Sequence, residues 1–128
     1  MGEFSLERFA LEDANVFCAR LKGPYRFEES LENAKKLAER LTREARAAVI
    51  LDYTEAVLAH TLEQFASVGD VFIEHAPKTC RFAYVFGDGN VMHAAAMTKR
   101  LKRAGFEAAA FPDWEQAEAY ARDGAAAA

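Results

Sequence analysis

The spacing of hydrophobic residues changes several times along the chain, and the first stretches have the spacing of β-strands. Residues 4–11 carry apolar side chains in a strand-like pattern, and Phe17, Ala19 and Leu21 alternate with their neighbours in 16–21. Turn-forming residues fill 12–15, and Gly23-Pro24 closes the second stretch. The pattern predicts a β-hairpin, so at least one strand of the sheet is antiparallel.

A helical spacing follows the hairpin. Apolar residues recur every three or four positions in one stripe, made of Leu31, Ala34, Leu37, Ala38, Leu41 and Ala45. Acidic residues at 28–29 begin this predicted helix, and Arg43 and Arg46 end it, as the helix dipole prefers. The uninterrupted apolar run 47–51, which stops at Asp52, is typical of a central strand covered on both faces. We expect 53–60 to be a loop.

Helices and strands then alternate to the end of the chain. Thr61 and Gln64 have capping-box spacing at the start of a helix that ends at Ala76-Pro77. Its predicted buried stripe is Leu62, Phe65, Ala66, Gly69, Phe72 and Ile73. A strand over 81–86, a helix over 91–103 capped by Asn90, a strand over 106–111 and a helix from Asp113 to 123–124 follow.

This order of elements, β-β-α-β-α-β-α-β-α, predicts the fold class. Repeated β-α units imply parallel strands with right-handed crossovers. We therefore expect an α/β fold with a five-stranded mixed sheet and four helices. The elements use residues 1–124 as a single domain, and the alanines at 125–128 are expected to be a disordered tail.

Composition and charge narrow the function classes. The chain has 128 residues, of which 52% are hydrophobic and 28% charged, as in an ordinary globular domain. The formal charge of −4 argues against binding to nucleic acid. One basic cluster, Lys99, Arg100, Lys102 and Arg103, complements a helix dipole or contacts an anionic partner. Membrane contact through four such charges would be transient at most.

The termini and cysteines indicate a compartment. The N-terminus lacks the pattern of a signal peptide, and no apolar run approaches the roughly 20 residues of a membrane span. Cys18 and Cys80 lie in apolar strand-like stretches, where we expect free thiols that pack as small hydrophobes. Neither these cysteines nor the histidines have metal-ligand spacing, so no metal and no cofactor is expected. We expect a cytoplasmic protein.

Three stretches carry a resemblance to a known fold family. They are Leu21-Lys22-Gly23 with Glu28-Glu29, the strand 49–54 that holds Asp52, and the segment 106–117 with its Phe111-Pro112 turn. In this order and spacing the chain resembles the STAS domains of anti-sigma-factor antagonists, which are SpoIIAA-like. It is more similar to a bacterial branch grouped with STAS and CRAL-TRIO lipid-transfer domains. The resemblance covers about 9–123 and implies a regulatory module.

The resemblance also implies a candidate phospho-acceptor. In the antagonists, a kinase phosphorylates a serine that opens the helix after the central strand, in an Asp-Ser-Ser/Thr-Gly type sequence. Thr61 matches that serine by position, whereas His60 replaces the aspartate and Glu63 replaces the glycine. A phosphate on Thr61 would gain from the helix N-terminus. The alternative is that Thr61 is an N-cap and nothing more.

Two loops supply the candidate binding residues. Asp52, Thr54 and His60 follow the central strand, where α/β sheets bind ligands, and an exposed His60 would titrate near neutral pH. The alternative is that Asp52 and Thr54 only satisfy backbone donors of the loop. Gly87, Asp88, Gly89 and Asn90 form a strand-to-helix loop with the geometry of an anion site, although a turn with an N-cap explains it too. Both loops are expected at the same end of the sheet.

These residues leave three functional hypotheses. The first is a non-enzymatic regulatory or protein-interaction module, because no catalytic constellation is present. Its partner is another protein or a second copy of the chain, as in a homodimer. The second is a carrier or sensor of a small apolar or lipid-like ligand, suggested by ten phenylalanines. The third is an enzyme that uses Asp52 for phosphoryl transfer, for which no partner residue stands out.

Overall fold

The computed structural model describes residues 3–127, and its elements follow the predicted order. The strands are β1 (Ser5–Ala10), β2 (Val16–Tyr25), β3 (Ala48–Leu58), β4 (Arg81–Val85) and β5 (Ala108–Phe111). The helices are α1 (Phe27–Arg43), α2 (Leu62–His75), α3 (Val91–Arg103) and α4 (Trp114–Ala127). The expected α/β fold with a mixed sheet is thereby confirmed.

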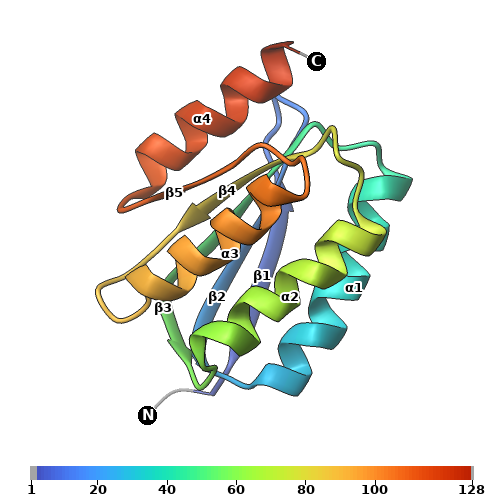
Figure 1. Cartoon of the computed structure of the whole chain (residues 1–128). Coiled ribbons are helices and arrows are strands. Elements are labelled where there is room, and N and C mark those ends of the chain that lie inside the picture. The colour runs from blue at the N-terminus through green and yellow to red at the C-terminus, as the bar shows by residue number, and fades with distance from the viewer. Residues whose placement is uncertain (1–2, 128) are drawn as a thin grey trace.

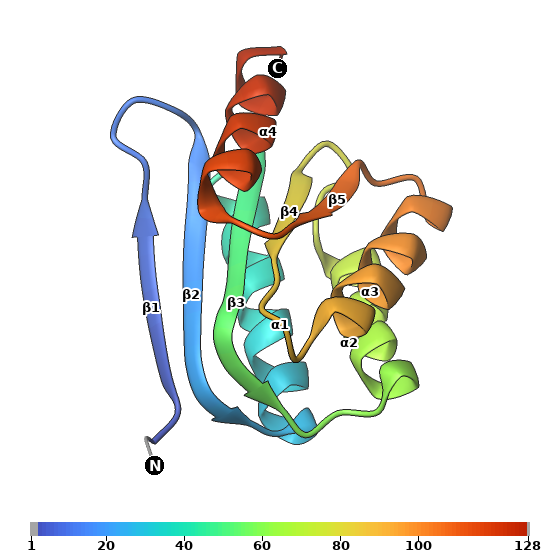
Figure 2. The ribbon, with the colours of Figure 1, turned by 90° about the vertical axis from the view of Figure 1, so that its left-hand side faces the viewer.

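The spatial order of the strands explains the layers of the fold. The strands lie in the order β1-β2-β3-β4-β5, with β1 antiparallel to β2 and the other pairs parallel. Each crossover advances by one strand in the same direction, so right-handed connections place α1, α2 and α3 on one face. Figure 1 shows these three helices together, and Figure 2 shows α4 alone on the opposite face. In Figure 2, α4 covers the upper part of its face and leaves the lower part of β2 and β3 without a helix.

The two faces of the sheet carry separate cores. The larger core joins strand residues such as Phe17, Val49 and Leu51 to the three helices, and the smaller joins Ile50 and Val85 to α4. Residues 48–51 are all buried, with Val49 and Leu51 in the first core and Ile50 in the second. The prediction of a central strand covered on both faces is therefore correct for this run.

Two strands are longer than predicted. β2 continues through Gly23-Pro24 to Tyr25, and β3 continues past Asp52 to Leu58, so 53–58 is strand and not loop. The last pair of β1 with β2 joins Ser5 to Lys22, so Pro24 lies beyond it, where a missing N–H costs no bond to β1. Gly23 has φ +86°, and a Cβ there would lie 2.7 Å from the Glu3 carbonyl oxygen.

Two helices end at other residues than expected. α1 ends at Arg43, because Ala45 adopts a left-handed φ of 51°, and Arg46 lies outside the helix. α4 continues through Asp123-Gly124 to Ala127, so the expected disordered tail is helical over 125–127, while residue 128 lies outside the described residues. Cys18 and Cys80 are buried free thiols. Within residues 3–127, no helix combines the length and apolar character of a membrane span.

Candidate functional site

The loops that carry most of the predicted site residues meet at the carboxyl end of the sheet. The Asn90 side chain donates to the backbone oxygens of Tyr53 (3.0 Å) and Ala56 (3.3 Å) and accepts from Gly87 N (2.9 Å). A Cβ on Gly87 would lie 2.5 Å from the Thr54 carbonyl oxygen, so only glycine allows this approach. Asn90 is the N-cap residue of α3, as predicted, but its buried side chain makes no capping hydrogen bond. It fastens this turn to β3 instead. Asp88 and Gly89 are exposed at the tip of the loop.

Asp52 lies inside β3 and interacts on the α4 face of the sheet. Its carboxylate accepts from Arg20 Nε at 3.1 Å and from Thr54 N at 2.9 Å, and the Thr54 hydroxyl also donates to it. Asp52 satisfies the backbone donor of Thr54, as the alternative expected, but it also pairs with Arg20 and lies inside β3, not at a strand end. Arg20 is its direct neighbour across the parallel pair β2–β3.

Arg20 is held on several sides in this cluster. Its guanidinium lies 5.4 Å from the ring centre of Phe9 and 4.8 Å from that of Trp114, and 3.6 Å from the Glu7 carboxylate. Cation–π contacts and the ion pair with Asp52 fix the side chain in one position. The cluster therefore ties β1, β2, β3 and α4 together. Sequence reasoning missed Arg20, because only the strand register brings it beside Asp52.

His60 lies on the opposite face from Asp52 and does not join its cluster. The side chain is only 5% exposed and packs against the rings of Tyr25, Phe27 and Phe65. Burial, and secondarily His93, lowers the pKa of His60. The exposure on which titration near neutral pH depended is therefore absent.

The hydrogen bonds of His60 define its tautomer. Its Nε2 lies 2.8 Å from Ser30 Oγ, and that hydroxyl donates to the Phe27 carbonyl oxygen at 2.6 Å. Because the hydroxyl has one hydrogen, His60 Nε2 carries the proton and donates to Ser30. Nδ1 has no partner among the described residues. The His60 carbonyl oxygen bonds to His93 Nε2 at 2.8 Å, which fastens α3 to the segment before α2.

Thr61 occupies the position that the capping box predicts. Its hydroxyl accepts from Gln64 N at 3.0 Å, and the Gln64 side chain accepts from Thr61 N at 2.9 Å. The N-cap interpretation of Thr61 is therefore correct. The residue is exposed. Leu62, which was predicted to be buried, is 42% exposed beside it.

Several large hydrophobic side chains are exposed at the same end of the sheet. The large ones among residues 3–127 are Val57, Leu62, Val91 and Met92, from the end of β3 and the first turns of α2 and α3. The sequence did not reveal this exposure, because an apolar residue that fits the pattern of a buried helix stripe, as Leu62 does, is expected to be buried. No group of three metal-ligating side chains occurs within residues 3–127.

The arrangement of strands and helices is similar to that of a solved structure. No family model and no curated protein matches the sequence. The leading hairpin, the mixed sheet and the three helices on one face define a SpoIIAA-like α/β fold, as the resemblance implied. The chain is similar to the crystal structure of an uncharacterised protein from the DUF3478 family, with a SpoIIAA-like fold, from Shewanella loihica PV-4. The TM-score is 0.58 at 15% identity, over 92% of this chain and 93% of that chain.

Proposed function

We propose that this domain is a non-enzymatic regulatory module of STAS type that binds a segment of a protein partner. The observation that carries the proposal is the exposure of four large hydrophobic side chains, Val57, Leu62, Val91 and Met92, on elements that meet at the carboxyl end of the sheet. Val57 and Met92 are each 64% exposed. Exposed large side chains collected from three elements are typical of a protein-interaction surface.

The chemistry of the partner is argued from the groove that continues this surface. The groove runs along α3 beside β5, with Phe86, Val91, Ala95 and Ala110 toward one end and Lys99, Lys102 and Arg103 toward the other. Positions 91, 95, 98 and 102 share one face of α3, so the groove changes from apolar to basic along that face. A partner segment with an apolar anchor followed by acidic residues complements it.

The charges of α3 favour an acidic segment. Arg100 is already neutralised, because it pairs with Asp70 at 2.8 Å and with Glu63 at 3.1 Å. Lys99, Lys102 and Arg103 form no ion pair with any residue of the described range 3–127. Three cations on one groove, in a domain with a formal charge of −4, would attract an acidic segment and orient it.

The surface is preorganised by the contacts beneath it. Asn90 and Gly87 fasten the β4–α3 turn to β3, and His93 fastens α3 to the segment before α2. A rigid surface loses little conformational entropy when a partner binds. These buried contacts support a docking role for the β4–α3 turn Gly87–Asn90 and for the segment before α2.

The proposal is tested by selecting peptides from a random library on the full chain. The affinity of the enriched peptides is then measured for wild type, for Lys99→Glu/Lys102→Glu, and for the control Lys35→Glu/Lys78→Glu. The control changes the charge equally at two exposed lysines away from the groove. We expect acidic peptides with an apolar anchor, weakened at least about tenfold by the groove variant and little by the control.

Two results would contradict the proposal. One is enrichment of peptides without acidic residues, or an equal loss of affinity in both variants. The other is a concentration-dependent dimer, detected by sedimentation equilibrium and abolished by Met92→Asp. That result would assign the surface to a second copy of the chain instead of a different protein.

A further inference from the structure

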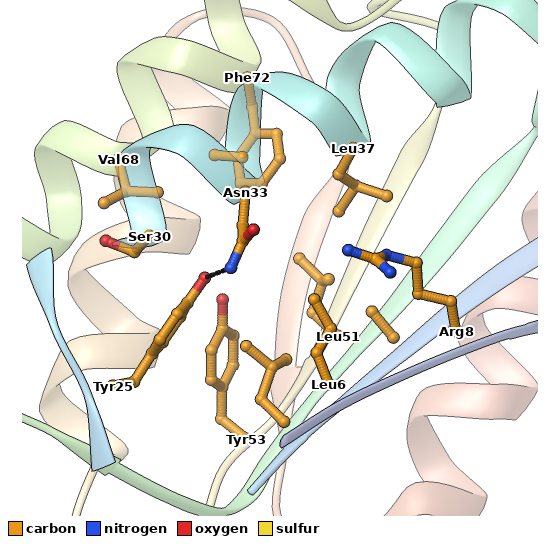
Figure 3. A pocket seen from close by; sticks show the side chains of 13 residues that line it. Leu6, Arg8, Tyr25, Ser30, Asn33, Leu37, Leu51, Tyr53, Val68 and Phe72 are labelled. Atoms are coloured by element: carbon orange, nitrogen blue, oxygen red, sulfur yellow. Dashed lines mark hydrogen bonds between the residues drawn. The ribbon is translucent and has the colours of Figure 1, made fainter. Parts of the chain in front are cut away.

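The hollows of the molecule differ greatly in size. The cavity between the sheet, α1 and α2, with Arg8 at its edge, measures about 30 Å³ (Figure 3). It has room for one or two water molecules and none for a lipid-like ligand. The groove along α3, by contrast, is open and measures about 620 Å³. A partner segment fits there, and the walls of the groove determine its conformation.

One wall of this groove is the edge strand β5. Within residues 3–127, β5 pairs with β4 and with no other strand. The Phe111 carbonyl oxygen accepts from Phe86 N at 3.0 Å, so Phe111 directs its backbone groups toward β4. Because backbone groups alternate sides along a strand, the N–H and C=O of Ala108 and Ala110 point away from β4. Ala108 is buried, whereas Ala110 is half-buried and lines the groove.

The side chains of β5 leave this edge accessible. Residues 108–110 are alanines, so β5 has no long or charged side chain beside Ala110 of the kind that commonly protects an edge strand. Pro112 follows the strand and has no N–H, so it limits an added strand to the few residues beside Ala110. Addition of an extended peptide to a sheet edge is a recurring mode of recognition.

The length of the groove sets the spacing of residues in such a segment. From Val91 to Lys102, α3 rises by about 16 Å. An extended chain covers this length with about five residues, and every second side chain faces α3. An apolar residue beside Val91 is therefore followed by acidic residues two and four positions later. A helical segment would need about eleven residues, and its backbone groups are already paired within the helix.

The direction of β5 sets the order of these residues. β5 runs parallel to β4 toward the end of the sheet where α3 begins with Val91, and Lys102 and Arg103 at the other end of α3 lie toward its start. In an antiparallel pair, two opposite residues exchange both hydrogen bonds, so one residue of the segment satisfies both groups of Ala110. A segment in this direction has its apolar anchor first and its acidic residues after it.

We propose that the partner segment binds as an extended strand antiparallel to β5, with its acidic side chains on the unpaired cations of α3. This inference rests on the proposed function and adds the conformation and direction of the segment. A second copy of the chain is a poorer occupant. Two β5 strands paired across a two-fold axis would bring together Lys99, Lys102 and Arg103 of both copies, and like charges across an interface repel.

The probe is the peptide acetyl-Thr-Leu-Thr-Glu-Thr-Glu-Thr-amide, titrated into the full chain and followed by amide chemical shifts. Opposite residues of two strands have their side chains on the same face, so the leucine and glutamates, which face α3, direct their N–H groups to β5. N-methylation of the leucine and the first glutamate should weaken binding at least about tenfold. N-methylation of the two inner threonines alters groups that point away from β5 and should change the affinity less than about twofold.

A variant of the chain gives the reciprocal test. Ala110→Pro removes the outward N–H of β5 and should weaken binding of the unmodified peptide about tenfold. The matched control is Ala10→Pro on the other edge strand, β1, where Leu11 N bonds to Val16 O and Ala10 therefore points outward. This control should bind as wild type does. If Ala110→Pro does not fold, the N-methylated peptides on the wild-type chain decide the question.

Three results would overturn the inference. They are an equal effect of both N-methylation patterns, equally tight binding of the reversed sequence acetyl-Thr-Glu-Thr-Glu-Thr-Leu-Thr-amide, and failure of the heptapeptide to bind where acidic peptides from the library do. In each case, sensitivity of the library peptides to Lys99→Glu/Lys102→Glu would leave the docking surface in place and refute only the strand. If the library also yields no acidic peptides, both proposals fail.

Discussion

Replacement of Asp52 tests whether its carboxylate holds the sheet together. The carboxylate is buried and accepts from Arg20 Nε, Thr54 N and the Thr54 hydroxyl. A hydrogen bond to a charged group contributes about 1.5–3 kcal/mol, and the exposed Thr54 regains part of its loss from water. Asp52→Ala should therefore lower the free energy of unfolding by about 2–3 kcal/mol. Asp52→Asn keeps an oxygen for Thr54 but loses the charge beside Arg20, so about 1–2 kcal/mol is expected.

Urea denaturation followed by circular dichroism measures these differences. Asp88→Ala is the matched control, because this exposed acid belongs to the other predicted loop and its loss should change stability by less than about 0.5 kcal/mol. A double-mutant cycle with Arg20→Leu isolates the ion pair and should give a coupling energy of about 1 kcal/mol or more. If Asp52→Ala is as stable as the control, the carboxylate does not hold the sheet together and the assignment is refuted.

Three further predictions follow from single residues. Because burial lowers the pKa of His60, with His93 adding to this effect and Glu28 opposing it, the unfolded chain binds the proton more tightly than the folded one. The contribution to stability is therefore complete above the ordinary pKa of about 6.5 and falls as the pH drops below it. Urea titrations at several pH values measure this loss of stability on acidification. His60→Phe should no longer show it, whereas His75→Gln should. If the free energy of unfolding falls equally with pH in wild type and His60→Phe, the burial of His60 is contradicted. Thr61→Ala should cost about 1 kcal/mol in the same assay, whereas Thr61→Ser should cost much less, and equal losses would argue against the cap. Burial raises the pKa of Cys18 to about 11 and that of Cys80 to about 12, so a thiol reagent at pH 8 should modify the folded chain slowly and both thiols quickly in urea. Fast modification of the folded chain would show that these thiols are accessible.

The element order was predictable because each element has a strong apolar period of its own. The capping box at Thr61 is a local signal and was correctly interpreted. Gly105, which follows α3 with φ +98°, is a local stop signal of the same kind. The lengths of β2 and β3 were not predictable in this way. Gly23-Pro24 is typical of a strand end. In the structure these two residues of β2 pair with Ala56-Val57 of β3, beyond the last residue pair that joins β2 to β1. That arrangement depends on the register of three strands.

The candidate site was predictable only in part, for the same reason. The sequence places Asp52, His60 and Gly87–Asn90 near one end of the sheet, but it does not say which face each side chain takes. Asp52 interacts with Arg20 because the two are partners in the β2–β3 register. His60 is buried because aromatic rings from three elements surround it. The cavity below Arg8 is likewise formed by side chains distant in the sequence.

The docking surface is the central claim, and a chemical-shift map tests it most directly. The isotope-labelled full chain is titrated with the tightest peptide selected on it, and the amide shifts are followed to saturation. The largest shifts should occur along the groove, at Phe86, Val91, Ala95, Thr98, Lys102 and Ala110. A map centred on α1 or on the α4 face, with these amides unmoved, would contradict the account.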